Sequence, residues 1–279
     1  MTTLDSPQIV VIGSGPVGVQ LVQEIYQRRP DAHIKLFGDE PHAPYNRVQL
    51  SSYLAGTFSS EKLALPLPAA DTYPNFQYHC THIEKVDIER KTLQDAQKTF
   101  HPYDVLILAT GSKPHVPSIP GTDLPGVYCF RSRKDADALF ARTVRSRQTV
   151  VIGGGLLGIE AAKGLLRHHT QVTLIQQAPH LMNRQLDAAG ASILKTTLEE
   201  LGIQVILQSG VREILGDTSV EGVRTRDGDI IECDTVLLCT GVQPNVQLAR
   251  EAGIRVNRGI VVDDHLETAR PNIFAVGEC

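Results

Sequence analysis

Two short apolar runs, each followed at once by glycines, stand out along the chain. Residues 9–12 read IVVI and residues 149–152 read TVVI, the pattern expected of strands that are buried on both faces. Apolar positions then recur at helical spacing, and a second apolar run follows each helix. The pattern therefore predicts two strand–helix–strand units. Their helices cover residues 17–29, before Pro30, and 156–168, and their second strands cover residues 34–37 and 172–175.

The two units are copies of one motif. Residues 10–18 read VVIGSGPVG and residues 150–158 read VVIGGGLLG, while a second matching pair, DVLILATG at 104–111 and DTVLLCTG at 234–241, lies downstream. A matching pair of such signals at similar spacing indicates an internal repeat. The fold class we predict is α/β, with two Rossmann-like dinucleotide-binding domains, each a βαβ unit plus an antiparallel meander.

The order of segments predicts that the second domain is inserted into the first. Residues 76–101 and 204–232 alternate in polarity and are expected to form the meanders, the second with an Asp227-Gly228 hairpin. Prolines 114, 117 and 120 mark a linker, and residues 243–245 mark a return. The predicted domains are 1–117 and 245–279 for the first and 118–244 for the second.

The glycine-rich turns are suited to a pyrophosphate. The first glycine (Gly13, Gly153) permits the tight turn, the second (Gly15, Gly155) lets the phosphates approach, and the third (Gly18, Gly158) lets the helix pack closely. The helix N-terminus then presents free N–H groups and partial positive charge. Two such sites make chemical sense if one holds FAD and the other a nicotinamide that reduces it. The expected contacts at the start of each helix also include Pro16, Leu156 and Leu157.

An acidic residue at the end of the second strand would bind an adenosine ribose. In the first unit Asp39 or Glu40 fits this role, although either alone could be a solvated turn carboxylate. In the second unit the position holds Gln176, with neither a carboxylate to repel a 2′-phosphate nor an adjacent arginine to attract one. The choice between NADH and NADPH therefore stays open, with NADH favoured.

Composition excludes several classes of protein. Apolar residues make up 42% and charged residues 21% of the 279 positions, and the net charge is −4, so the chain is globular and lacks the basic surplus of a nucleic-acid binder. No apolar run reaches membrane-spanning length and no signal peptide precedes the first strand. Five scattered cysteines without a Cys-x-x-Cys pair, and histidines without metal spacing, predict a cytoplasmic protein with no metal site.

Further signatures resemble the pyridine-nucleotide-linked flavoprotein reductases with two dinucleotide-binding domains. They are ATG at 109–111, LCTGVQPN at 238–245 and NIFAVGEC at 272–279. Residues 38–51 and 181–187 look most like the N-terminal flavin region of the NAD(P)H-dependent nitrite reductase large subunit, with rubredoxin and ferredoxin reductases next. The resemblance implies an FAD-dependent NAD(P)H oxidoreductase that passes electrons to a small iron–sulfur protein or to a downstream sirohaem/iron–sulfur module.

The resemblance also implies roles for single residues. It places Glu278 on the ribityl chain of FAD, Arg131 near FAD and Glu160 on the nicotinamide, although Glu160 and Arg131 also fit as solvated surface charges. Arg47 would supply positive charge near the reduced flavin, and Ser52 stands where ferredoxin-type reductases often carry a lysine. The full FAD set is Gly13, Gly15, Pro16, Gly18, Asp39, Glu40, Arg47, Ser52, Ile83, Ala109, Thr110, Gly111, Arg131, Gly277 and Glu278. The full NAD(P) set is Gly153, Gly155, Leu156, Leu157, Gly158, Glu160, Gln176 and Gly241.

Alternatives to this activity are also open. A disulfide reductase would carry a redox cysteine in residues 45–56, where this chain has none. A signalling or scaffold module would bind FAD and NADH but turn over poorly. The basic stretch from Arg131 to Arg147 is either an exposed helical face or a docking site for an acidic electron carrier. The resemblance further implies a C-terminal interface domain beyond Cys279, and dimerisation through it. The sequence lacks that domain and any nitrite-reducing cofactor module.

Overall fold

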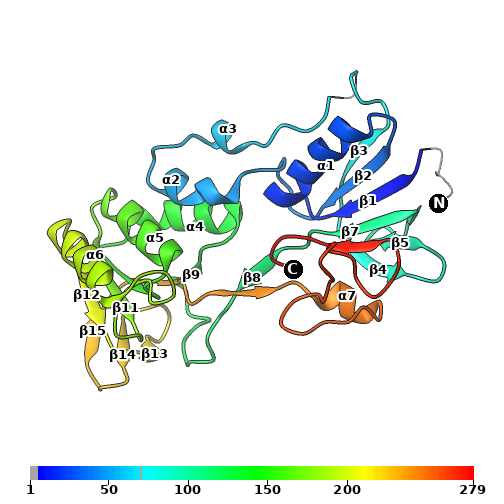
Figure 1. Ribbon diagram of the computed structural model, residues 1–279. Coiled ribbons are helices and arrows are strands. Elements are labelled where there is room, and N and C mark those ends of the chain that lie inside the picture. Colours follow the sequence, from blue (N-terminus) through cyan, green and yellow to red (C-terminus); the bar gives the residue numbers. More distant parts are fainter. Residues whose placement is uncertain (1–5, 70) are drawn as a thin grey trace. The chain divides into compact units, whose positions relative to one another are not determined.

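The computed structural model describes residues 6–69 and 71–279 and divides into two compact units (Figure 1). The first unit holds the described residues up to Asn46, Ala64–Lys113 and Gln243–Cys279. The second unit holds Arg47–Leu63 and Pro114–Val242. The short strands β8 (Ser112–Pro114) and β17 (Val242–Pro244) pair where the chain passes from one unit to the other and back. Residues 47–63, which we assigned by sequence to the first domain, group with the second unit.

A five-stranded parallel sheet forms the centre of the first unit, in the order β18-β7-β1-β2-β3. Its strands are β1 (Gln8–Ile12), β2 (His33–Gly38), β3 (Phe76–Cys80), β7 (Val105–Leu108) and β18 (Ile273–Ala275). Helix α1 (Pro16–Arg28) connects β1 to β2, and a short helix, α7 (Gln247–Glu251), precedes β18. The antiparallel meander consists of β4 (Ile83–Asp87), β5 (Thr92–Asp95) and β6 (Phe100–Pro102).

The second unit repeats this plan with the sheet order β12-β11-β10-β16-β9, again all parallel. Its strands are β9 (Val127–Cys129), β10 (Gln148–Ile152), β11 (Gln171–Gln176), β12 (Ile203–Leu207) and β16 (Thr235–Leu238). Its meander consists of β13 (Val211–Leu215), β14 (Gly222–Thr225) and β15 (Ile230–Glu232). Its helical segments are η1 (Arg47–Gln49), α2 (Leu50–Leu54), α3 (Ser60–Leu63), α4 (Arg133–Thr143), α5 (Leu156–Leu166) and α6 (Ala188–Glu200).

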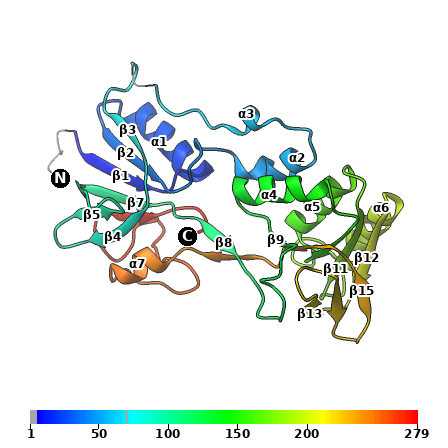
Figure 2. The ribbon, with the colours of Figure 1, turned by 180° about the vertical axis from the view of Figure 1, so that it is seen from behind.

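The central strands are apolar throughout because both of their faces are covered. In β1, Ile9 and Val11 pack with α1, whereas Val10 and Ile12 join the cluster under the meander and α7. Figures 1 and 2 show α1 on one face of this sheet and β4–β5 on the other. The predicted α/β fold with two Rossmann-like units is therefore confirmed.

The boundaries of the meanders were predicted wrongly. Residues 76–80 and 204–207 were expected to open the meanders, but β3 and β12 pair in parallel with β2 and β11 and extend the main sheets. Both strands lie at the edge of a sheet, and both mix exposed residues with buried or half-buried ones. Their sequences therefore resemble those of meander strands, which are also covered on one face only. The Asp227-Gly228 hairpin is present, and Gly228 has φ +97°.

Helix α6 was not predicted, although its start carries a plain signal. The Asp187 side chain accepts a hydrogen bond from the Gly190 N–H at 2.8 Å and caps the helix. Helix α4 begins in the same way, with a reciprocal capping box between Ser132 and Asp135. Within the described part of the chain, no helix has both the length and the apolarity needed to cross a membrane.

Matching aspartates fasten the start of the first strand in both units. Asp104 accepts from the Gln8 N–H at 2.8 Å. Asp234 accepts from the backbone N–H of Arg147 at 2.6 Å and of Gln148 at 3.2 Å, and from the Ser146 hydroxyl at 2.8 Å. Burial alone would raise the pKa of Asp234, but the Thr235 hydroxyl, which donates to its carboxylate at 2.6 Å, and these three bonds outweigh burial and hold the pKa below its ordinary value.

We predict that Asp234→Asn lowers the free energy of unfolding by about 2 kcal/mol at pH 7, because an amide cannot accept all four bonds that the carboxylate accepts. A lowered pKa in the folded state means that this stabilisation is present above about pH 4 and is lost as the pH falls further. Urea denaturation at several pH values measures it. The exposed Asp229→Asn, in the neighbouring hairpin, is the control. An equal loss for Asp234→Asn at pH 7 and pH 3 would contradict the assignment.

Candidate cofactor sites

The first glycine of each turn is forced by the backbone. Gly13 has φ +119° and Gly153 has φ +117°, a region that side chains rarely adopt. A Cβ on Gly13 would lie 2.0 Å from the carbonyl oxygen of Ala109, and one on Gly153 would lie 2.2 Å from that of Cys239. Ala109 and Cys239 occupy equivalent places in the repeated DVLILATG and DTVLLCTG segments. The predicted role of the first glycine, the tight turn, is therefore visible in both units.

The third glycine of each turn is forced by close packing. A Cβ on Gly18 would lie 1.9 Å from the Gly13 carbonyl oxygen, and one on Gly158 would lie 2.0 Å from that of Gly153. The helix can therefore begin directly over the turn. Because of this, the axis of each helix starts at the carboxyl end of its first strand, where dinucleotides bind in this kind of sheet.

Neither the backbone conformation nor packing within the protein requires a glycine at the second position of the turn in the second unit. Gly155 has φ −83°, an ordinary value, and a Cβ there would meet nothing within 4 Å. Gly155 precedes α5, whose first turn has no side-chain cap. Open space beside free N–H groups fits a pyrophosphate that must approach the backbone. Gly15 precedes α1 with the same extended conformation, φ −71° and ψ −178°, and also without a side-chain cap.

A cavity of about 530 Å³ adjoins the turn of the first unit. Four of the predicted FAD residues line it: Gly13, Asp39, Ile83 and Thr110. Asp39 faces this cavity, whereas the Glu40 carboxylate accepts a hydrogen bond from the Tyr45 hydroxyl at 2.6 Å and is not among the lining residues. The structure therefore favours Asp39 over Glu40 as the partner of an adenosine ribose.

Residues near the end of the chain bond to residues 110 and 112 of the first unit. Seven more predicted residues are outside the cavity lining, so their contact with FAD stays a prediction: Gly15, Pro16, Gly18, Ala109, Gly111, Gly277 and Glu278. The Thr110 hydroxyl donates to the Asn245 carbonyl oxygen and the Asn245 amide donates to the Thr110 carbonyl oxygen, both at 2.8 Å. The Ser112 hydroxyl donates to Glu278 at 3.0 Å. Asn245 and Ser112 were not predicted as site residues. Gly111 and Gly277, which were predicted, take φ +63° and +85°.

Three residues of the predicted FAD set, Arg47, Ser52 and Arg131, belong to the second unit, so their contact with FAD stays a prediction. The Arg131 backbone N–H donates to Asp135 at 3.0 Å and takes part in capping α4. The Glu160 carboxylate, on α5, accepts a hydrogen bond from the Ser51 hydroxyl at 2.9 Å. Serine 51, and not Ser52 at the lysine position, is thus the partner of this glutamate.

A second cavity, of about 420 Å³, adjoins the turn of the second unit. The predicted residues Gly153, Gly155, Gln176 and Gly241 line it. Leu156, Leu157, Gly158 and Glu160 are outside its lining, and their contact with a nicotinamide nucleotide stays a prediction. No arginine adjoins Gln176 in the sequence, but the fold brings two arginines, Arg184 and Arg226, to this cavity. They lie 8 and 50 positions from Gln176 in the sequence, too far for a local pattern to reveal.

Four of the five thiols lie where burial disfavours the thiolate. Burial raises the pKa of Cys233 and of Cys239 to about 12, and it also raises the pKa of Cys129 and Cys279. Cys80 is exposed. Among residues 6–69 and 71–279, no group of three or more His, Cys, Asp or Glu side chains is arranged to hold a metal ion.

Comparison with known proteins agrees with this geometry. The family model described as pyridine nucleotide-disulphide oxidoreductase matches residues 7–279. The chain belongs to this family. The description of this family names a pyridine nucleotide, which agrees with a chain that carries two glycine-rich dinucleotide turns.

The relatives include both branches that the sequence motifs indicated. The chain is 44% identical over 276 residues to "Nitrite reductase [NAD(P)H]" of Bacillus subtilis (strain 168), covering 98% of this chain and 34% of that protein. It is 34% identical to rhodocoxin reductase of Rhodococcus erythropolis, covering 97% of this chain and 64% of that protein. The chain thus spans about a third of the length of its nitrite reductase relative.

The solved structures show the same fold. The ferredoxin reductase for the CYP199A2 system from Rhodopseudomonas palustris superposes with a TM-score of 0.93 at 30% identity, covering 98% of this chain and 68% of that chain. Putidaredoxin reductase, in its covalent complex with putidaredoxin, gives 0.92 at 28% identity, covering 99% of this chain and 68% of that chain. The predicted family membership and its two branches are confirmed.

We predict that Gly155→Ala weakens NAD(P)H binding by about tenfold or more, because the added methyl group occupies space beside the pyrophosphate N–H donors. Since no protein atom lies within 4 Å of that methyl position, the free energy of unfolding should fall by less than about 1 kcal/mol. Fluorescence titration and urea denaturation measure the two effects.

Gly158→Ala is the matched control, because its methyl group would press on the Gly153 carbonyl oxygen. It should lower the free energy of unfolding by about 1–3 kcal/mol. Unchanged nucleotide affinity in Gly155→Ala would show that the second glycine does not face the phosphates.

Proposed function

We propose that this chain is the hydride-transfer module of a larger flavoprotein, with FAD in the first unit and NAD(P)H in the second. The observation that carries the proposal is the duplicated turn, in which Gly13 and Gly153 make the same strained approach to Ala109 and Cys239. When both cofactors are bound, NAD(P)H supplies a hydride and the flavin accepts it, which is chemistry intrinsic to the cofactors.

The first unit supplies the groups that would hold FAD. The N-terminus of α1 faces the carboxyl end of β1 and presents backbone N–H groups to the pyrophosphate. Asp39, on the first cavity, is the acceptor for the adenosine ribose hydroxyls. Glu278, fixed by the Ser112 hydroxyl, is the acceptor for the ribityl hydroxyls. Each of these groups binds and orients, and none needs to move a proton.

The second unit supplies the groups that would hold the nicotinamide nucleotide. Gly155, which directly precedes α5, lines the second cavity, so the free N–H groups at the start of α5 would bind the pyrophosphate. Glu160 is placed two residues beyond Gly158 and is oriented by Ser51, and we propose that it positions the nicotinamide. Arg47 begins η1, and Ser51 and Ser52 lie in α2, which follows η1 directly. We propose that Arg47 supplies positive charge near the reduced flavin.

The electron acceptor is proposed from the relatives. The candidates are the two that the sequence resemblance implies, a downstream sirohaem/iron–sulfur module and a small iron–sulfur protein. A nitrite reductase relative supports the first, and the complex of putidaredoxin reductase with putidaredoxin supports a separate protein acceptor. We propose the first, because the nitrite reductase branch carries the higher identity. We also propose that the whole protein is a homodimer through a domain that follows this chain. Five free cysteines fit a reducing compartment such as the cytoplasm.

Disulfide reduction is not favoured, because the chain lacks a cysteine in residues 45–56 and burial raises the pKa of four of its five thiols. We therefore propose that this chain does not carry out the disulfide reduction that the family description names.

The test is rapid mixing of the FAD-loaded chain with NADH and with NADPH under anaerobic conditions. We expect the visible flavin absorbance to bleach within seconds with at least one of the two, because the binding groups for both cofactors are preformed. A slow reaction with long-lived charge-transfer absorbance would favour a binding or signalling module instead. A thiol count that rises by two on reduction would favour disulfide chemistry.

A further inference from the structure

The second cavity carries a positive charge that the repeat does not explain. Among the described residues that line it, two are arginines, Arg184 and Arg226, and none is an aspartate or glutamate. The first cavity, by contrast, is lined by Asp39, Glu84 and Glu251 beside its cationic residues. The lining of the second cavity is therefore more positive than that of the first, and it favours a ligand with more negative charge.

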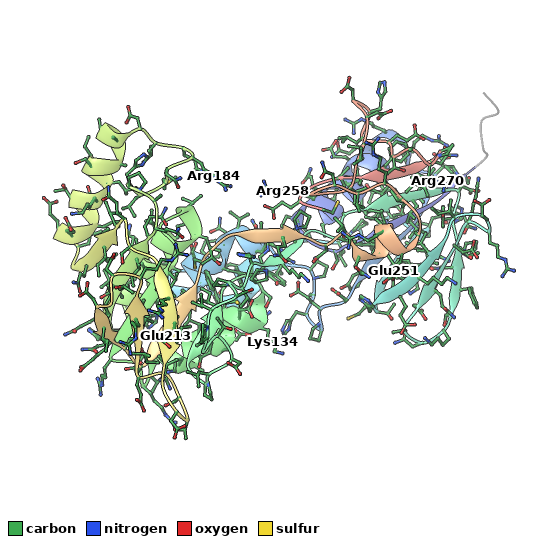
Figure 3. All side chains as sticks on the ribbon, turned by 90° about the horizontal axis from the view of Figure 1, so that it is seen from below. Lys134, Arg184, Glu213, Glu251, Arg258 and Arg270 are labelled. Carbon is green, nitrogen blue, oxygen red and sulfur yellow. The ribbon has the colours of Figure 1, made fainter. Side chains whose placement is uncertain are left out.

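Arg184 is held at the cavity by its loop. The Met182 N–H donates to the Gly154 carbonyl oxygen at 2.9 Å, and the Gln185 N–H donates back to the Met182 carbonyl oxygen at 2.8 Å. This turn fastens residues 182–185 to the glycine-rich turn. Figure 3 shows Arg184 on the loop that leads into α6, with its side chain projecting away from that helix. Within the described part of the chain it forms no ion pair.

Arg226 reaches the same place from the meander. Its backbone N–H donates to the Gly210 carbonyl oxygen at 2.7 Å, and its side chain packs over Gly210, where a Cβ would lie 3.1 Å from the Nε atom. Ser209, which precedes Gly210, donates its N–H to the Gln176 carbonyl oxygen at 3.3 Å. Two segments distant in sequence thus bring a guanidinium each to the end of β11.

The end of β11 is where the adenosine ribose of a dinucleotide lies in this kind of sheet. Gln176 occupies the position where an NAD-specific site holds a carboxylate. Its side-chain oxygen accepts from the Gly154 N–H at 3.0 Å, and its amide group donates to the Asn183 side chain at 3.4 Å. The side chain is turned toward the glycine-rich turn, and no charge at this position repels a phosphate.

We propose that Arg184 and Arg226 bind the 2′-phosphate of NADPH, so that the second unit prefers NADPH to NADH. This inference rests on the proposed function, since it assigns the nucleotide of that same site. NADH would leave both guanidinium groups beside a neutral ribose hydroxyl, whereas a 2′-phosphate dianion forms charge-assisted hydrogen bonds with them. The preference for NADH suggested by the residues adjacent to Gln176 is thereby reversed.

The test compares 2′,5′-ADP with 5′-AMP, which differ only in the 2′-phosphate, by isothermal titration calorimetry on the FAD-loaded full chain. We expect 2′,5′-ADP to bind at least about tenfold more tightly, and each of Arg184→Ala and Arg226→Ala to reduce this ratio several-fold. The double variant should bring the ratio close to one. Arg184→Lys should retain part of the ratio, because lysine keeps the charge without the fork of donors. Arg145→Ala, an exposed arginine of the same unit outside the cavity, should leave the ratio unchanged.

A ratio of about one in the wild-type chain would overturn the inference, as would variants that weaken both ligands equally. These results are distinct from a failure of the proposed function, which would appear as flavin that neither NADH nor NADPH reduces. Thermal denaturation of each variant shows whether a lost ratio reflects lost folding. If an alanine variant unfolds, the lysine variant at the same position is measured instead. A lysine variant with the same ratio of 2′,5′-ADP to 5′-AMP affinity as the wild-type chain would then overturn the assignment of that arginine.

Discussion

The close approach of a glycine to a neighbouring strand is the constraint on which both sites depend. At Gly13 and Gly153 the backbone adopts φ near +120°. It passes so near the carbonyl oxygen of the residue that directly follows β7 or β16 that a side chain has no room. This turn places the N-terminus of a helix at the carboxyl end of the sheet. Without it, the free N–H groups of α1 and α5 would not converge on a phosphate-sized space.

The two units differ in how they finish the same sheet. In the first, the fifth strand is β18, from the end of the chain, and in the second it is β9, which precedes the glycine-rich turn. Both strands pair in parallel with the strand of the Thr-Gly signature. The fifth strand can therefore come from a segment that follows the strand–helix–strand unit in the chain or from one that precedes it. This arrangement lets the second unit be inserted into the first while each keeps a complete sheet.

The sequence was sufficient where a short pattern determines the structure. The strands β1 and β10, the helices after them and the roles of the first and third glycines follow from apolar runs and turn chemistry, and all are present. It was insufficient where pairing is long-range. Edge strands β3 and β12 alternate like meander strands, and β9 and β18 are only three residues long. Ser51 bonds to Glu160, and Arg226 lines the same cavity as Gln176, only because the chain folds back over large separations.

The central claim is that one chain binds two different dinucleotides at separate sites. Its most direct measurement is the binding stoichiometry of the purified chain, by absorbance for FAD and by equilibrium dialysis for ADP-ribose added to the flavin-loaded protein. The account predicts one FAD and one ADP-ribose per chain, bound at the same time and without competition. Displacement of FAD by ADP-ribose, or saturation at a single nucleotide per chain, would contradict it.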